Sequence, residues 1–517
     1  MIKNKINTSL IGVLVCLSSM LGGCTSSYDD LNTNPDATTK VTPAMLATNL
    51  LLDFVKSANS QNSELLCKRV FWGEQIDYYQ YNSFGKGSFS GVRNLTNGVK
   101  MVELASDVDK DAYSGLFYFL KGWAFYRATM DMGDVPYSEA LDIEKFKNPK
   151  YDTQKDVFAG ILSDLAKAEE CFSKATTSFR GDPFYKGDPA LWRKATNVLR
   201  LKVLLALSKR ADDTPELRVK ETFAQIVSEG NLFGSNADNL QVSYSDKAGQ
   251  QNPLHYTQTK SINVYAGCNV IIDPLKAYQD YRLFYYFDPM QALTDPLYLP
   301  EGETLLQRDD WNAYRGVDPS APFNVEQKKI TTYMHSRFNG VYRNSYVGVP
   351  SIRLGYGDMN FMLAEAVERG WISGNAKAYY EAGIKASFDF VRNTVPAEYT
   401  NGVQITPDYV TGYLASAPVA YQVNAIPMER MKQVWMQSYL ASFFHLAWDS
   451  YYTYRRVGYP ELPVNPETNL NPSTTKIPLR WLYPEGEVNY NKEQLQIALQ
   501  RQWNGADDVN SVMWLLK

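Results

Sequence analysis

The chain has few of the residues that build metal or nucleophilic centres. Among 517 residues there are three histidines, His255, His335 and His445. None of them lies in an HExxH motif or in another close ligand spacing, and no GxSxG motif supports a Ser-His-Asp triad. We therefore expect each histidine to be structural, and no motif indicates an enzyme or a cofactor.

Cysteine is scarce as well. Cys67, Cys171 and Cys268 follow the N-terminal region and form no CxxC pair. An odd number without metal-ligand spacing indicates neither a disulfide framework nor a zinc site. Buried free thiols are the favoured interpretation, although the sequence leaves a single disulfide open.

Two further absences limit the class of protein. The formal net charge is -4, so no basic field would concentrate nucleic acid. Beyond residue 30 no run approaches about 20 consecutive apolar residues, the length that a helix needs to span a bilayer. The body of the chain is therefore predicted to be soluble and to bind no nucleic acid.

The first 23 residues differ from the rest. Lys3 and Lys5 precede the apolar run Ser9–Leu21, which is right for a signal peptide and too short to span a membrane. The next residues are Gly22-Gly23-Cys24, and the junction resembles the bacterial lipobox, whose cysteine is acylated and becomes the new N-terminus. We expect residues 1–23 to be cleaved and Cys24 to carry the lipid. An ordinary signal peptide with an incidental cysteine is the alternative.

A polar segment separates this anchor from the body. Residues 24–42 contain few apolar residues and many Asn, Asp and Thr, which suits a flexible tether. Pro43 begins a helical pattern, and we expect residues 43–517 to form a single domain.

Amphipathic patterns predict a mainly helical body. Few alternating runs compete with them, apart from short ones such as NLQVSYS and KKITTYM. The helices are predicted over Asp111–Met130, Thr153–Lys174, Pro189–Lys209, Pro215–Ser228, Asp358–Gly370, Ala376–Arg392, Met428–Trp448 and Lys492–Gln502.

Some of these helices fit the pattern of a tetratricopeptide (TPR) pair. With Asn360 as the fourth position, Leu363 and Ala364 occupy packing positions of the first helix, and Tyr380 and Gly383 those of the second. A weaker pair starts near Gly122 and is completed by GILSDLAKAEECF. Unrelated helical hairpins are the alternative, because the pattern is loose.

A long irregular stretch lies between the helix pairs, at about residues 233–357. It is rich in Tyr, Asn, Asp, Gly and Pro. A loop region of this length inside a compact protein is usually functional or disordered, and its aromatic content argues against disorder. We expect it to fold onto the helices and to carry the ligand-facing surface.

One motif has a weak resemblance to a cation site. In GDPFYKGD, Asp182 and Asp188 together with nearby carbonyls could hold a hard cation such as calcium. Asp-Pro turns before a helix explain the same residues without a metal. The second interpretation is favoured.

Aromatic residues are abundant, with 36 Tyr, 23 Phe and 10 Trp. In FWGEQIDYYQYNSF and YLPEGETLLQRDDWNAYRG they alternate with amide and charged groups. An apolar ring face can stack on a sugar or on a peptide side chain while the polar neighbours bind its edges. Core packing is the alternative for any single ring. The predicted ligand-binding residues are Trp72, Tyr79, Tyr81, Asn82, Tyr298, Trp311, Tyr314 and Arg315.

The motifs taken together resemble one family. The lipobox, LNTNPDATTKVTPAML, MGDVPYSEAL, GDPFYKGDPALWRKATNVLRLKVLLALSKR, YGDMNFMLAEAVERG, WMQSYLASFFHLAWDSYYTYRRVGYP and PLRWLYPEGEVNYN occur in the order found in SusD/RagB lipoproteins of Bacteroidetes. The chain is most similar to the SusD-like branch that carries GDVPYSEAL. The resemblance implies a mainly α fold, in which TPR-like helix pairs form a right-handed helical scaffold with a large irregular, loop-rich region packed on it.

The resemblance also implies a function. Such proteins bind nutrients at the cell surface and act as a lid on a TonB-dependent transporter of the SusC type in the outer membrane, capturing oligosaccharides or, in some relatives, peptides. The residues leave two alternatives open: a surface hydrolase of glycans, which needs only two carboxylates, and a scaffold that seals the transporter without binding a ligand. The pair Asp29-Asp30 resembles the acidic signal that directs lipoproteins of these bacteria to the cell exterior.

Overall fold

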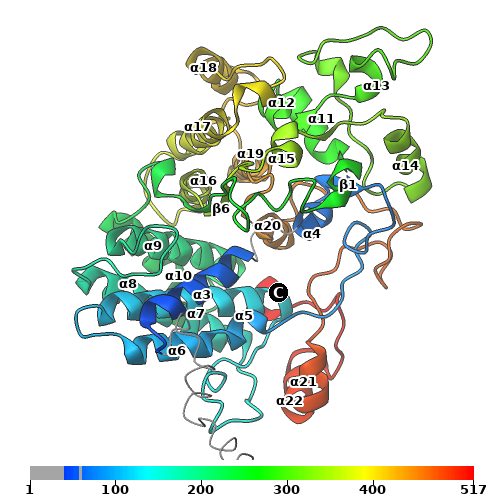
Figure 1. Ribbon diagram of the computed structural model, residues 1–517. Coiled ribbons are helices and arrows are strands. Elements are labelled where there is room, and N and C mark those ends of the chain that lie inside the picture. Colours follow the sequence, from blue (N-terminus) through cyan, green and yellow to red (C-terminus); the bar gives the residue numbers. More distant parts are fainter. Residues whose placement is uncertain (1–39, 57–60, 447) are drawn as a thin grey trace, which may run out of the picture. The chain divides into compact units, whose positions relative to one another are not determined.

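The computed structural model describes residues 40–56, 61–446 and 448–517 (Figure 1). The predicted signal peptide, Cys24 and most of the tether lie outside these ranges. Residues 43–517 form one compact unit. Within the described ranges, no helix is both long enough and apolar enough to cross a membrane.

Helices dominate both ends of this unit, and their positions follow the amphipathic patterns closely. Thr153, for example, caps the helix that follows it by accepting a hydrogen bond from the N–H of Asp156 at 3.2 Å. The helices before the irregular stretch are α3 (Pro43–Lys56), α4 (Gln61–Leu66), α5 (Ser90–Arg93), α6 (Leu95–Leu104), α7 (Lys110–Met132), α8 (Gln154–Lys174), α9 (Pro189–Ala206) and α10 (Val219–Glu229). Those after it are α16 (Tyr356–Glu368), α17 (Ala376–Thr394), α18 (Pro407–Ala415), α19 (Pro427–Ala441), α20 (Asp449–Val457), α21 (Glu485–Tyr490) and α22 (Lys492–Trp503).

Both predicted helix pairs form. Helix α7 packs along α8, and α16 along α17. A Cβ atom at Gly122 would lie 2.6 Å from Leu165, and one at Gly383 would lie 2.6 Å from Phe361. Only glycine therefore lets these helices approach so closely. The mainly α, TPR-like fold class is confirmed.

Two predicted helices are wrong in their extent. Residues Pro215–Leu217 form a 3-10 turn, and α10 begins only at Val219, after Arg218 with a φ angle of 47°. The pattern over Met428–Trp448 suggested one continuous helix, but α19 ends at Ala441 and α20 begins at Asp449. Between them Phe444 and Leu446 adopt positive φ angles of 56° and 53°. The Leu446 N–H donates to the carbonyl of Ile352 at 2.9 Å, so a tertiary hydrogen bond replaces a helical one here.

The irregular stretch contains more regular structure than the sequence indicated. Its KKITTYM segment, which alternates like a strand, instead ends helix α14. Besides short 3-10 turns, the stretch includes α11 (Asn269–Ala277), α12 (Arg282–Tyr286), α13 (Gln291–Thr294), α14 (Phe323–Thr331), α15 (Gly340–Asn344), β2 (Leu240–Val242), β3 (Tyr265–Gly267), β4 (Phe287–Asp288), β5 (Arg337–Phe338) and β6 (Ser351–Leu354).

These strands form two small sheets. In the first, β1 (Val70–Trp72) joins the irregular stretch in an antiparallel sheet of order β1-β3-β5-β4. In the second, β2 pairs antiparallel with β6. The four-stranded sheet separates two buried clusters, because its two faces carry alternate residues of each strand.

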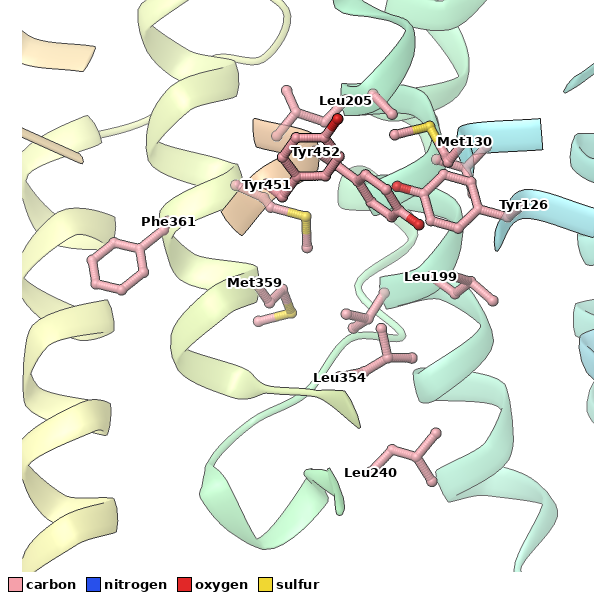
Figure 2. Packing of buried hydrophobic residues seen from close by; sticks show 14 of the residues in the cluster. Tyr126, Met130, Leu199, Leu205, Leu240, Leu354, Met359, Phe361, Tyr451 and Tyr452 are labelled. Atoms are coloured by element: carbon pink, nitrogen blue, oxygen red, sulfur yellow. The ribbon is translucent and has the colours of Figure 1, made fainter. Parts of the chain in front are cut away.

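The main core connects the helix pairs (Figure 2). Met359 on α16 and Tyr452 on α20 lie between α16 and α9, while Phe361 on α16 points the other way, toward Gly383 on α17. All of these apolar side chains are buried. Burial of each contributes about 1.5–3 kcal/mol, so this core supplies a rigid base for the irregular stretch.

Candidate functional site

A cavity of about 280 Å³ lies beside the four-stranded sheet, in the irregular stretch. It opens between the sheet and the C-terminal end of α14. Its lining comes from the residue after β1, the segment before β3, α13, α14, the segment between α14 and β5, and β5 itself: Gly73, Asn263, Val264, Gln291, Ile330, Thr331, Tyr333, His335 and Arg337.

Sheet register fixes the position of one lining residue. Arg337 lies opposite Ala266 on β3 and opposite Asp288 on β4. Residues that oppose each other across antiparallel strands share a face, so Arg337 and Asp288 lie on the same side of the sheet. The neighbouring Phe338 faces the other side and stacks on Tyr265, with ring centroids 5.6 Å apart.

His335 is a buried polar group that the fold leaves unpaired. Its side chain is only 4% exposed, yet neither ring nitrogen makes a hydrogen bond of normal geometry within the described residues. Burial lowers the pKa of His335 to about 4, with the Lys329 backbone acting in the opposite direction. At neutral pH the ring is therefore uncharged and presents one donor and one acceptor.

Two tyrosines stand beside the opening. Tyr333 follows α14 with a φ angle of 58°, and its ring centroid lies 4.5 Å from that of Tyr298. The two side chains are 37% and 36% exposed. Leu297, next to Tyr298, is 79% exposed. The rim is therefore an uncovered aromatic and aliphatic surface next to buried polar groups.

A larger cavity, of about 500 Å³, lies in the helical part and has a different character. Its lining includes Asp131, Arg127 and Trp448. The Asp131 carboxylate accepts a hydrogen bond from Tyr452 at 2.5 Å, and the Arg127 guanidinium lies over the rings of Trp448 and Tyr452. These polar groups are bound by neighbouring side chains, so we regard the smaller cavity as the better candidate.

The residues predicted from the first aromatic motif lie mainly beneath the surface. Trp72 on β1 is half-buried and stacks on Tyr265, with ring centroids 6.1 Å apart. The Tyr79 hydroxyl accepts a hydrogen bond from the Trp481 indole at 3.0 Å. Tyr81 is buried and donates to a backbone carbonyl at 2.9 Å, while Asn82 accepts from the buried Lys68 ammonium at 2.8 Å.

The second motif contributes one rim residue. Tyr298 lies beside the cavity, whereas Trp311 is half-buried against Phe284. Tyr314 is buried and its hydroxyl donates to the Arg308 carbonyl at 2.7 Å; Arg315 is exposed. Contact with a ligand by the buried Tyr81, Asn82 and Tyr314 would require them to be uncovered, and it stays a prediction.

The carboxylates of the weak cation motif have local roles. Asp182 accepts hydrogen bonds from the N–H groups of Phe184 and Gly187 and from the Trp192 indole, each at 2.8 Å. Asp188 caps α9 by accepting from Ala190 at 2.8 Å. In the described part of the chain, no group of three or more His, Cys, Asp or Glu side chains is arranged to hold a metal ion. This geometry matches the turn interpretation.

The remaining cysteines and histidines lie outside the cavity lining. Cys67, Cys171 and Cys268 are free thiols in the structure. His255 stacks on Tyr346 at 4.1 Å, and burial lowers the pKa of His445 to about 3.

Sequence reasoning missed three cavity residues, Tyr333, His335 and Arg337. They stand in KKITTYMHSRF, where histidine was expected to be structural and the alternation suggested a plain strand. The useful signal was the combination of His, Arg and Tyr within five residues of the irregular stretch. It became specific only when burial and hydrogen bonding were known.

Comparison with known proteins identifies the family. The SusD-like family described as "Starch-binding associating with outer membrane" matches residues 35–484. The chain belongs to this family. The SusD-like description names binding and outer-membrane association, and it names no catalytic activity.

Solved structures of SusD homologues agree. One from Bacteroides fragilis NCTC 9343 has 44% identity and a TM-score of 0.87, and a second from the same strain has 33% and 0.80. A candidate nutrient-binding outer-membrane protein from Bacteroides vulgatus ATCC 8482 has 30% and 0.81. Each comparison covers 92% of this chain and 100% of the other. A search of curated proteins finds no significant match.

Proposed function

We propose that this SusD-like protein captures oligosaccharides at the cell surface and delivers them to a SusC-like TonB-dependent transporter in the outer membrane. The observation that carries the binding part is the cavity beside the four-stranded sheet, where exposed tyrosines border buried polar groups without partners. Membership of a family described as starch-binding supports a glycan rather than a peptide as the ligand.

The chemistry of the cavity suits a sugar. The rings of Tyr333 and Tyr298 offer exposed faces on which the apolar CH face of a pyranose can stack. Gln291 and Asn263 add amide groups inside the cavity, and His335 adds a neutral donor and acceptor. Apolar contact combined with a few fixed polar groups is typical of small-ligand sites.

The alternatives have less support. A glycan hydrolase of the usual kind needs two carboxyl groups, about 5–5.5 Å or 6.5–9.5 Å apart. None of the residues that line the cavity in the described structure is Asp or Glu. A scaffold that only seals the transporter would need neither the cavity nor the exposed tyrosines.

Substitution of Tyr333 tests the proposal. Tyr333→Ala removes a stacking surface, so we expect glycan affinity to fall about ten-fold, which corresponds to about 1.4 kcal/mol. Isothermal titration against neutral, acidic and peptide libraries would measure it. Tyr490→Ala is the control, because this side chain is 82% exposed on α21. Equal glycan binding by both variants, or cleavage of the glycan by the protein, would contradict the proposal.

We propose that the predicted residues Trp72 and Trp311 contact the ligand at the edge of the cavity. Trp72 directly precedes Gly73 of the cavity lining. Trp311 is half-buried and lies four residues before Arg315 in the sequence. Alanine at Trp72 or Trp311 would reduce affinity less than alanine at Tyr333, because each indole already packs against another ring. The same titrations rank the three variants.

The membrane anchor is the second part of the proposal. Cleavage after Gly23 and acylation of Cys24 would leave residues 24–42 as a tether, and Asp29-Asp30 would direct export to the cell exterior. In Cys24→Ala cells the protein should leave the membrane fraction. Alanine at both Asp29 and Asp30 should remove its protease accessibility on intact cells, and co-purification with the SusC-like protein tests the partnership.

A further inference from the structure

Positively charged side chains outnumber negatively charged ones around the cavity. Arg337 is the one charged residue among those that line it in the described structure. Arg308 and Arg343 lie close by, and both contact Asp288. One carboxylate therefore pairs with two arginines here, while a third arginine, Arg337, lies beside it.

Asp288 makes no ion pair with Arg337, because its two oxygens bind other arginines. Sheet register places the two residues opposite each other, but one carboxylate oxygen of Asp288 binds Arg308 at 3.1 Å and the other binds Arg343 at 2.5 Å. Arg337 makes no ion pair within the described residues, and its buried Nε atom has no hydrogen-bond partner. Burial and then the nearby charge of Arg343 lower the pKa of Arg337; Asp288 acts in the opposite direction, and Arg308 lowers the pKa again.

An unpaired guanidinium beside a cavity is costly unless a ligand supplies the counter-charge. A partly buried cation that lacks a partner loses hydration without a compensating bond. A planar carboxylate or a sulfate can accept two parallel hydrogen bonds from the guanidinium fork. His335 lies two residues away and is also unpartnered, so a second buried donor faces the same space.

We propose that the cavity binds an acidic sugar, whose carboxylate or sulfate pairs with Arg337 while its ring lies against Tyr333 and Tyr298. This inference rests on the proposed function, because it names the chemical class of the glycan. The exposed rim gives general affinity for sugar rings, and Arg337 selects chains that carry negative charge. A neutral sugar in the same position would leave the guanidinium without a counter-ion.

A matched pair of probes tests the charge requirement. Oligogalacturonides of four to six units and their methyl-esterified forms share one backbone and differ in charge. A sulfated oligosaccharide and its desulfated parent form a second pair, which separates carboxylate from sulfate recognition. We expect at least one acidic probe to bind at least ten-fold more tightly than its neutral partner, with a preference that weakens at high salt.

Three variants locate the effect. Arg337→Gln should abolish the preference for the acidic probe, and Arg337→Lys should retain part of it, because a lysine keeps the charge and loses the fork. Arg180→Gln is the control, since Arg180 is exposed in the segment between α8 and α9, remote in sequence from the cavity. Unchanged melting temperatures would show that the variants fold.

The outcomes separate the two proposals. Equal binding of acidic and neutral probes that depends on Tyr333 would overturn the acidic-sugar inference and leave glycan capture intact. A preference for acid that survives Arg337→Gln would also overturn the inference. Binding of none of the four probes, nor of any glycan in the wider library, would overturn the proposed function and the inference with it.

Discussion

Two clusters of buried polar groups, one around Glu365 in the helical scaffold and one beside the cavity, are paired differently. In the scaffold, Glu365 on α16 binds Arg456 at 2.8 Å, Arg369 at 2.7 Å and the Trp435 indole at 2.8 Å. These partners lower the pKa of Glu365 to about 2 against the opposing effect of burial. In the irregular stretch, His335 and Arg337 remain without such partners.

The difference is consistent with the proposed roles, in which the Glu365 cluster stabilises the fold and the cavity binds a ligand. A buried charge with several partners fixes the position of helices but offers nothing to a ligand. A buried polar group without partners costs stability, and a ligand can recover that cost. Under the proposed function, the helices form the frame and the unpartnered groups of the cavity are available to a ligand.

Breaking the scaffold network should have the largest effect. Glu365→Ala leaves Arg456 and Arg369 near one another without their carboxylate, so we expect a loss of about 3–5 kcal/mol in the free energy of unfolding. Urea denaturation would measure it. Ligand affinity of the folded fraction should be unchanged; a loss below about 1 kcal/mol would contradict the comparison.

Helix packing offers a second test within the scaffold. Gly383→Ala places a Cβ atom 2.6 Å from the Phe361 ring, and we expect it to cost about 1–3 kcal/mol. Gly412→Ala is the matched control in helix α18, because no atom lies within 4 Å of its Cβ position. That control should be stabilised by up to about 1 kcal/mol. Similar effects at both positions would argue against close packing as the reason for Gly383.

Acid should destabilise both regions through their buried histidines. The pKa of His445 is lowered to about 3 and that of His335 to about 4, below the ordinary value of about 6.5. Between the folded-state pKa and the unfolded-state pKa of each histidine, the unfolded protein binds more protons than the folded protein. The free energy of unfolding is therefore highest above about pH 6.5 and falls as the pH decreases toward 4. From pH 7 to 5.5 each histidine should account for about 1 kcal/mol. Urea titrations of His445→Gln at both pH values should show a shallower decrease than the unsubstituted protein, and an equal decrease would count against this cause.

Substitution of His335 has the smallest expected effect on stability. His335→Leu removes an unpartnered polar ring from the cavity wall, so we expect the free energy of unfolding to stay level or rise by up to about 1 kcal/mol. Glycan affinity should fall in the same variant. Thermal melting and titration together check this, and a clear loss of stability would mean that His335 supports the fold.

Sequence patterns predicted the frame well. Apolar spacing, the cap at Thr153 and the small residues Gly122 and Gly383 are local signals, and the structure places them as expected. The same patterns extended α19 to Trp448, because amphipathic spacing does not reveal that Leu446 bonds to Ile352 across the fold. The candidate cavity lies in the stretch that the sequence predicted to face a ligand, with Tyr298 at its rim; ligand binding there stays a prediction.

What the sequence determined by itself was the family and the helical class, since these depend on motifs and periodicity along the chain. Tertiary structure decided which side chains reach the cavity. Tyr81 and Tyr314 are buried, while Arg337 is unpaired because Arg308 and Arg343 occupy both oxygens of Asp288. Burial and competition for a partner arise only between segments far apart in sequence, so no local pattern records them.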